Sequence, residues 1–185
     1  MNIRKPTDYT SMFTALDTLM AAQLPQMELY REIGRLVSGR SEKGAAVAAS
    51  EYLQAAYPTA EGFSPRNLRR MREFYAAYEE SPEIMHLAMR LGWTRNVAIL
   101  EGCGSNKERA WYIRAALRFG WKKAKLLESI KTQAWRNSSL DEQVVSCYTG
   151  EKEITQESES DEEDTLCMPW QYLPQPHGRV RDEGL

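Results

Sequence analysis

The sequence has few residues that bind metals or form cross-links, and it has no long apolar run. Its 185 residues include three cysteines, which are widely spaced at Cys103, Cys147 and Cys167. This number and spacing fit neither a disulfide framework nor a zinc site, and a reducing location fits them best. No stretch approaches the roughly 20 apolar residues of a membrane span, and no apolar run of a secretory signal follows residues 1–6. We therefore expect a cytoplasmic protein that does not contact membranes.

Motifs typical of nucleotide-binding and metal-dependent enzymes are also missing. His86 and His177 have no cysteine or acidic residue at a ligand spacing, and neither a Gly-x-Gly-x-x-Gly nor a Walker pattern occurs. Cys103 lies in a glycine-rich segment expected to be a turn, but no base is apparent that would activate its thiol. A buried, inert cysteine is therefore the simpler interpretation. We expect no metal, no cofactor and no enzymatic activity.

The formal net charge of −2 conceals two oppositely charged parts. Residues 1–136 hold 21 Lys and Arg against 14 Asp and Glu, a net charge of +7, whereas residues 137–185 hold 3 against 12, a net charge of −9. A basic body joined to an acidic tail favours an anionic partner for the body. The alternative is that the tail only confers solubility.

The hydrophobic pattern predicts an all-α, multi-helix domain over residues 1–136. Apolar residues recur at helical spacing, and the alternating Val- and Ile-rich runs typical of strands are nearly absent. The expected helices cover residues 8–22, 26–37, 42–57, 64–78, 82–91, a segment that begins at 93, and residues 105–119 and 122–135.

Two glycine–tryptophan pairs mark the later helix junctions. Gly92-Trp93 and Gly120-Trp121 each follow a helical pattern, and glycine permits the left-handed turn that closes a helix. We expect each tryptophan to pack at a corner. Ser105 begins a capping-box pattern with Glu108. In the last helix, Leu126, Leu127, Ile130 and Ala134 are expected to face inward.

The segment GFSPRNLRRMREFY, residues 62–75, has the strongest functional signal. Ser64 is an expected N-cap, with proline at the first helical position. Apolar side chains fall on one arc of this helix, whereas Arg66, Arg69 and Arg70 fall on the opposite arc and Arg72 lies on the flank. The alternatives are a DNA-reading helix and a surface helix with solvated arginines. We expect Asn67, near the apolar arc, to be structural.

The two successive helical segments, residues 42–57 and 64–78, predict a helix-turn-helix-like unit. In that arrangement residues 42–57 brace the DNA backbone and residues 64–78 enter the major groove. Ser64 and the backbone amides of the first turn are suited to bind a phosphate. The predicted DNA-binding residues are Ser64, Arg66, Arg69, Arg70, Arg72, Lys122, Lys123 and Lys125.

The last 49 residues, 137–185, are expected to form an acidic, disordered tail. Residues 149–165 are acidic and nearly free of large apolar groups. Residues 166–176 are apolar, aromatic and proline-rich, a composition typical of an extended docking segment. The alternative is an unanchored tail. The acidic part either competes with DNA phosphate for the arginines of residues 66–70 or only solvates the chain.

Three motifs carry a resemblance to a known family over about residues 9–136: LYREIGRLV at 29–37, the segment at 62–75, and ERAWYI at 108–113 followed by FGW at 119–121. On these motifs the chain resembles the N-terminal domain of the YhcG-type bacterial proteins. The resemblance implies a helical, helix-turn-helix-like DNA-binding module. In full-length members that module precedes a nuclease domain of the PD-(D/E)xK type, and the tail looks like that of stand-alone forms on mobile elements.

The chain departs from the full-length family pattern. The nuclease needs a metal-binding Asp and an acidic-x-Lys triplet, and no lysine here has an acidic residue two positions before it. We therefore expect a non-catalytic protein that binds duplex DNA and does not cleave it. The alternative is an adaptor for a separately encoded nuclease or recombinase.

Overall fold

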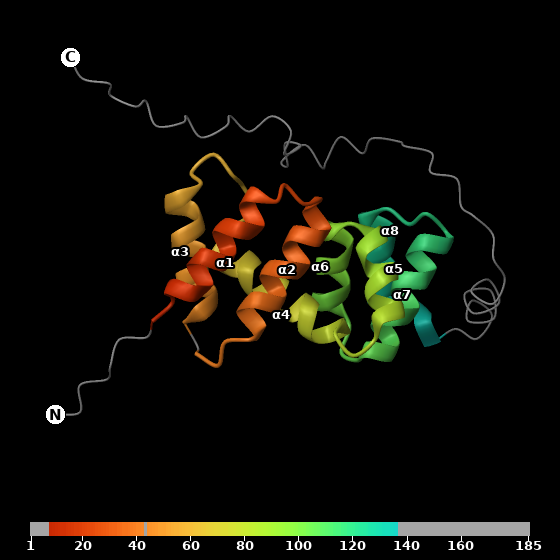
Figure 1. Cartoon of the computed structure of the whole chain (residues 1–185). Helices are drawn as coiled ribbons and strands as arrows, with labels where there is room; N and C mark the ends of the chain where they lie inside the picture. Colours follow the sequence, from red (N-terminus) through yellow and green to blue (C-terminus); the bar gives the residue numbers. More distant parts are fainter. Residues whose placement is uncertain (1–7, 43, 137–185) are drawn as a thin grey trace, which may run out of the picture.

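The structure, a computed structural model, describes residues 8–42 and 44–136. No strand occurs among these residues, and the predicted all-α fold is confirmed (Figure 1). The expected acidic tail, residues 137–185, lies outside the described part of the chain. The helices are α1 (Thr10–Ala21), α2 (Gln26–Ser38), α3 (Ala45–Ala56), α4 (Pro65–Tyr78), α5 (Pro82–Leu91), α6 (Trp93–Gly102), α7 (Asn106–Arg118), α8 (Lys123–Lys131) and the 3-10 helix η1 (Ala134–Arg136).

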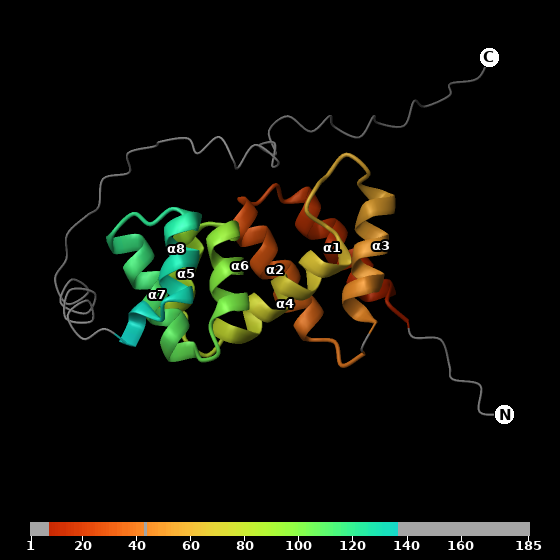
Figure 2. The ribbon, with the colours of Figure 1, turned by 180° about the vertical axis from the view of Figure 1, so that it is seen from behind.

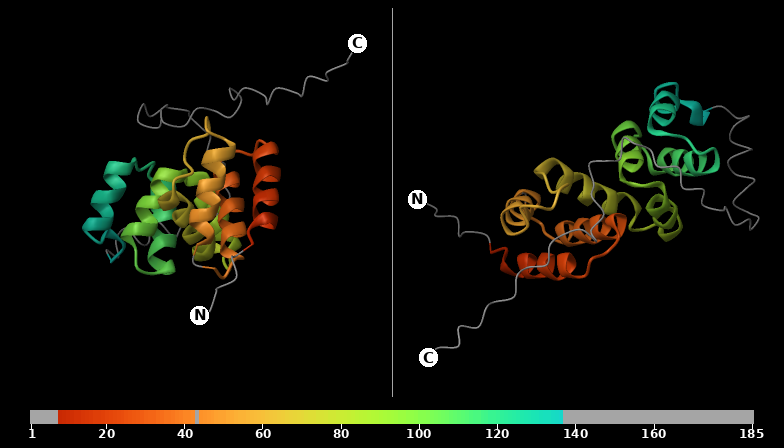
Figure 3. Two further views of the ribbon diagram at one scale, coloured as in Figure 1. Left: turned by 90° about the vertical axis from the view of Figure 1, so that its left-hand side faces the viewer. Right: turned by 90° about the horizontal axis from the view of Figure 1, so that it is seen from above.

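The helices pack around two hydrophobic cores at opposite ends of an elongated molecule (Figure 1 and Figure 3). The N-terminal core is formed by α1, α2, α3 and the first half of α4, and the C-terminal core by the second half of α4 together with α5–α8. Leu68 and Met71 belong to the first core, and Phe74 and Tyr78 belong to the second. All four side chains are at most 1% exposed, so α4 is a shared element of both halves.

Trp93, the first residue of α6, packs against both cores. Its ring meets Tyr30 of α2 with 4.9 Å between ring centroids and Phe74 of α4 with 5.8 Å, in both cases edge to face. This geometry is the one that aromatic quadrupoles favour. Trp93 therefore connects α2, α4 and α6 where the two cores meet.

The sequence signals for α4 correspond to its observed start and end. The Ser64 Oγ accepts a hydrogen bond from the backbone N–H of Asn67 at 3.3 Å, and Pro65 occupies the first helical position. The helix ends at Tyr78, which confirms the predicted helix over 64–78. Figure 2 shows α4 running between α3 and α6, and it packs against both.

The predicted glycine corners are also present. Gly92 has a φ of +84° and Gly120 a φ of +60°, and each is followed by a half-buried tryptophan. At the first corner the buried Asn96 side chain donates to the carbonyl oxygens of Ala88 at 2.7 Å and Gly92 at 2.8 Å. The first bond satisfies a carbonyl group that the end of α5 leaves without a helical partner, and the Gly92 carbonyl also accepts the backbone N–H of Asn96 at 3.2 Å. Asn96 thus closes this helix end with its side chain.

Three details of the sequence prediction are wrong. The third helix begins at Ala45, later than the expected residue 42, and the last α-helix ends at Lys131 instead of continuing to residue 135. Leu127, expected inside, is 45% exposed, whereas Leu126 and Ser129 are buried. One residue corresponds to about 100° around a helix, so the core-facing position of Leu126 turns Leu127 outward.

A close backbone approach joins α2 to α4. A Cβ added to Gly34 would lie 2.2 Å from the carbonyl oxygen of Met71 and 2.8 Å from its carbonyl carbon. No side chain fits between these two backbones. Glycine at this position therefore lets the two helices pack at this distance.

None of the helices in the described part of the chain is both long enough and apolar enough to cross a membrane.

We expect Gly34→Ala to lower the free energy of unfolding. Alanine normally stabilises a helix interior by about 1 kcal/mol relative to glycine, so a net loss would isolate the steric effect. The added methyl group forces α2 and α4 apart, and overpacking of this kind costs about 1–3 kcal/mol. Denaturant titration followed by circular dichroism measures the change.

Gly104→Ala is the matched control, because nothing lies within 4 Å of a Cβ at that position. Its stability should remain within about 0.5 kcal/mol of the parent chain. A Gly34→Ala variant as stable as the Gly104→Ala variant would contradict the close approach of α2 and α4.

Candidate nucleic-acid interface

A cleft of about 740 Å³ opens where the start of α4, the face of α6 and the start of α8 meet. We call it the α4–α6 cleft. Charged and aromatic side chains line it together, so it combines groups that bind anions with apolar surface. The lining residues used in the argument below are Asn67, Arg70, Trp93, Glu101, Lys123 and Leu127.

Glu101, near the end of α6, is paired with two of the predicted DNA-binding arginines. The Arg70 Nε donates to Glu101 Oε1 at 2.9 Å, and Arg70 Nη2 contacts the same oxygen. The Arg66 Nη2 donates to that oxygen at 3.3 Å. The hydrogen bond from Arg70 lowers the pKa of the Glu101 carboxyl, which keeps the group ionised at neutral pH. One carboxylate is therefore shared by two guanidinium groups, which leaves a local excess of positive charge.

The two paired arginines differ in their access to solvent. The Arg66 side chain is 74% exposed, whereas the Arg70 side chain is 23% exposed. Arg69 is exposed on the same helix. Arg66 and Arg69 can therefore meet a ligand directly, whereas Arg70 is held along the surface of the cleft.

The remaining predicted residues of α4 have separate surroundings. Ser64 is exposed and accepts the capping hydrogen bond described above. Arg72 is half-buried, and its carbonyl oxygen accepts a hydrogen bond from the Ser38 Oγ of α2 at 3.4 Å. Arg72 is not among the residues that line the α4–α6 cleft.

Of the three predicted lysines, Lys123 lines the same cleft as Arg70. Lys122 and Lys125 are also exposed at the start of α8. The Lys125 Nζ pairs with Glu128 Oε2 at 2.9 Å on its own helix. The structure thus brings Arg66, Arg70 and Lys123 around one surface.

Asn67 has the structural role expected from its position. Its Nδ2 donates to the carbonyl oxygen of Gly62 at 2.6 Å, and its Oδ1 accepts from the Trp93 Nε1 at 2.9 Å. Both polar ends of its side-chain amide are thus used within the protein. These bonds fix the loop before α4 and the tryptophan that borders the cleft.

Glu101 is the residue of the candidate site that the sequence reasoning missed. It lies 31 residues from Arg70 and 35 from Arg66 in the chain. Patterns within one helix carry no information about a contact at that separation. Only the packing of α6 against α4 places the carboxylate beside the arginines.

Cys103 is buried, as the simpler interpretation of the sequence held. Its side chain is 4% exposed, and burial raises its thiol pKa to about 12, with a further contribution from Glu108. Arg109 acts in the opposite direction. Among residues 8–42 and 44–136, no group of three or more His, Cys, Asp or Glu side chains is placed to hold a metal ion.

We expect Cys103 to react slowly with iodoacetamide in the folded protein. At pH 8 a thiol with a pKa of about 12 has about a thousandfold less thiolate than one with the ordinary value of about 8.5, because a raised pKa delays ionisation. Peptide mass spectrometry of chains alkylated with and without urea measures the difference. Equal rates in the two samples would contradict the burial of this side chain.

Comparison with known proteins identifies one family. The DUF1016 N-terminal domain matches residues 15–137 of the chain. Neither the curated proteins nor the solved structures include a significant match. The matched range includes all of α2–α8, the C-terminal core, the buried residues of the N-terminal core other than Met12, and the α4–α6 cleft. The chain therefore belongs to the family of the DUF1016 N-terminal domain, the YhcG-type domain that its motifs resemble.

Proposed function

We propose that this chain is a non-catalytic protein that binds duplex DNA through the surface around the α4–α6 cleft. The supporting observation is that Arg70 and Lys123, which come from two helices, line one cleft, and that Arg66 shares the Glu101 carboxylate of that cleft with Arg70. The DUF1016 N-terminal domain, which matches residues 15–137 of this chain, is not itself a known catalytic domain. In this proposal α4 approaches the DNA groove and the lysines of α8 contact the backbone.

The distribution of charge between the two halves supports this placement. Residues 82–136, which form α5–α8 and η1, hold 11 Lys and Arg against 4 Asp and Glu, a net charge of +7. Residues 8–81 hold 8 against 10, a net charge of −2. The arginines of α4 lie beside the basic half, because α4 packs against α6. DNA phosphates are attracted to a surface of this kind, and counterion release then favours binding.

Glu101 does not prevent phosphate binding. An ion pair between exposed groups contributes about 0–1 kcal/mol, so an incoming phosphate can replace the carboxylate at Arg66 with little loss. A phosphate oxygen accepts hydrogen bonds from guanidinium in the same geometry as a carboxylate. Glu101 therefore holds the arginines in place before DNA arrives.

The exposed stripe of α4 limits which part of this helix can read DNA. Its exposed residues are Arg66, Arg69, Glu73 and Ala76. Only the first two turns are basic, since Glu73 would repel phosphate. Recognition helices make their base contacts mainly from their N-terminal residues, and Arg66 and Arg69 occupy that part of α4.

The lengths of the interhelical connections suggest a second element at the interface. The connection between α3 and α4 covers residues 57–64, longer than the turn of about three to four residues typical of helix-turn-helix units. The connection between α7 and α8 covers residues 119–122 and contains Gly120, which matches that turn. We therefore assign the start of α8, with Lys122 and Lys123, a place at the interface beside α4.

We expect the triple variant Arg66→Ala, Arg69→Ala and Arg70→Ala to bind duplex DNA more weakly. Each phosphate contact that is lost should flatten the slope of log K against log salt concentration by up to about 0.9. Fluorescence anisotropy with a short labelled duplex at several salt concentrations measures both affinity and slope.

The matched control is the triple variant Arg31→Ala, Arg35→Ala and Arg90→Ala, which removes the same charge away from the α4–α6 cleft. It should bind DNA more tightly than the α4 variant. Equal losses of DNA affinity in the two folded variants would show that binding depends on the net charge of the protein and not on the position of these arginines. Unchanged affinity and slope in the α4 variant would reject the interface and favour the adaptor role.

Glu101→Gln is expected to change the DNA affinity in the opposite direction. It removes the carboxylate that competes with phosphate but keeps the shape of the side chain. The variant should bind DNA more tightly than the parent chain in the same assay, with the larger gain at low salt. Unchanged affinity at low and high salt would mean that DNA does not use Arg66 and Arg70.

Deleting residues 138–185 should tighten nonspecific DNA binding at low ionic strength. The deleted residues carry a net charge of −9, and a tethered anion competes at an effective concentration of about 1 mM. Screening over roughly 10 Å at 0.1 M salt should remove the difference. Equal low-salt affinities of the full-length and shortened chains would show that the tail only solvates the protein.

A further inference from the structure

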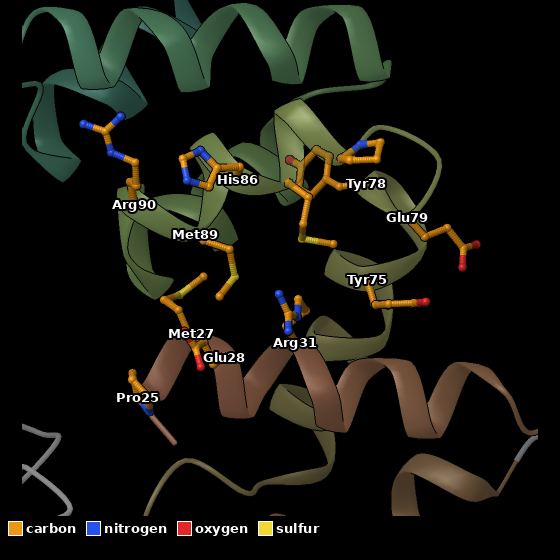
Figure 4. Close-up of a pocket in the computed structure, with 12 residues that line it drawn as sticks. Pro25, Met27, Glu28, Arg31, Tyr75, Tyr78, Glu79, His86, Met89 and Arg90 are labelled. Carbon is orange, nitrogen blue, oxygen red and sulfur yellow. The ribbon is translucent and has the colours of Figure 1, made fainter. Parts of the chain in front are cut away.

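A second cavity lies apart from the DNA-binding surface, between α2, the end of α4 and α5 (Figure 4). Its volume is about 550 Å³. The apolar groups that line it include Met27 of α2, Tyr75 of α4, and Met85 and Met89 of α5. We call it the Met groove. None of its lining residues belongs to the α4–α6 cleft.

The apolar side chains of the Met groove are incompletely covered. Met27, Tyr75 and Met89 pack against the C-terminal core but are only partly buried. Methionine side chains are flexible and polarisable, so they adapt to apolar ligands of irregular shape. The groove therefore has the chemistry of a site for an extended apolar peptide.

The charged residues at the rim give the groove two different ends. Figure 4 shows Arg90 and Glu79 at opposite ends. Arg90 is exposed and makes no ion pair with any other described residue. Arg31, in the middle of the groove, pairs with Glu32 at 2.8 Å. An acidic flank of a bound peptide would therefore lie at the Arg90 end.

The same sequence contains a segment that matches these properties. Residues 166–176, LCMPWQYLPQP, combine large apolar and aromatic side chains with three prolines. Proline-rich segments of this kind bind as extended chains on aromatic and apolar grooves. Residues 149–165, which precede the segment, hold 8 acidic residues and one lysine, a net charge of −7. That charge is equal and opposite to the +7 of residues 82–136, which include α5.

The chain is long enough for this segment to reach the groove. The 3-10 helix η1 packs against α7, and α7 packs against α5, so η1 and the groove are about two interhelical distances apart, or about 20 Å. A chain of roughly 30 residues, such as 137–165, has a root-mean-square span of about 30 Å. The connection therefore permits the segment to bind within one molecule.

We propose that residues 166–176 bind in the Met groove of the same chain, with Asp161–Asp164 at the Arg90 end. Trp170 and Leu173 supply the apolar groups that cover Met27, Tyr75 and Met89. Binding of this kind brings the acidic residues 149–165 over the basic half of the protein. The proposal is independent of DNA binding, and its test contains no DNA.

The test uses a fluorescein-labelled synthetic peptide of residues 161–176 and full-length proteins in reducing buffer. The first variant, Trp170→Ser with Leu173→Ser, removes the internal competitor and should bind the peptide. The parent chain should bind it about tenfold more weakly, as expected for an intrinsic Kd of about 100 µM and an effective internal concentration of about 1 mM. Fluorescence anisotropy gives the two affinities.

Two further variants test whether the peptide binds in the Met groove. Adding Met89→Glu to the first variant should abolish peptide binding, because a carboxylate would lie among the apolar groups of the groove. Adding Leu127→Glu should leave it unchanged, because Leu127 lines the α4–α6 cleft. Thermal melting followed by circular dichroism checks that the variants fold, and Met27→Glu replaces Met89→Glu if that variant does not.

The proposal is overturned if the first variant does not bind the peptide, or if it and the parent chain bind it equally. It is also overturned if both glutamate variants lower binding alike, since the contact would then be nonspecific. Sedimentation equilibrium distinguishes binding of the segment within one molecule from binding between two copies of the chain. A parent chain that dimerises, and returns to a monomer on Trp170→Ser with Leu173→Ser, would place the segment in the groove of a second copy.

Discussion

The packing of α4 into both hydrophobic cores is the constraint on which the rest of the structure depends. Leu68 and Met71 are buried in one core, and Phe74 and Tyr78 in the other, so α4 cannot move relative to one half without disturbing the other. The contact at Gly34, where the backbones of α2 and α4 meet without an intervening side chain, fixes this helix further. The arginines of its first turns are therefore held at set positions relative to α6 and α8. A rigid helix of this kind can present side chains to a partner with little loss of conformational entropy.

Much of the fold could be predicted because its signals are local. Ser64 and Ser105 cap helices with their own side chains, and Gly92 and Gly120 adopt positive φ values at the two corners. Each of these features depends on a few adjacent residues, and a residue pattern is sufficient to indicate it. A helix boundary is less fully encoded by adjacent residues, as α8 illustrates. Its apolar pattern continues past Lys131, but the helix stops there and η1 follows.

The features that could not be predicted depend on contacts between distant segments. Glu101 meets Arg66 and Arg70 only because α6 packs against α4, and no periodicity within either helix encodes that contact. The exposure of Leu127 likewise depends on which side of α8 faces α6 and α7. The Met groove brings together side chains of α2, α4 and α5, whose methionines look like ordinary core residues in the sequence. Sequence reasoning identified the candidate arginines, but only the tertiary structure shows what they contact.

The two surfaces differ in the side chains that they offer, which is why we propose a different partner for each. The α4–α6 cleft includes Arg70, Glu101 and Lys123, whereas the Met groove combines three methionines and two tyrosines with two arginines and two glutamates. Salt weakens interactions at the first surface, because exposed charges are screened, but has little effect on apolar burial at the second. Both surfaces include residues of α4, Arg70 at one and Tyr75 and Tyr78 at the other. Because α4 is rigidly held by both cores, occupation of one surface can affect the other mainly through charge, and the acidic residues 149–165 are the part of the sequence with the charge to do so.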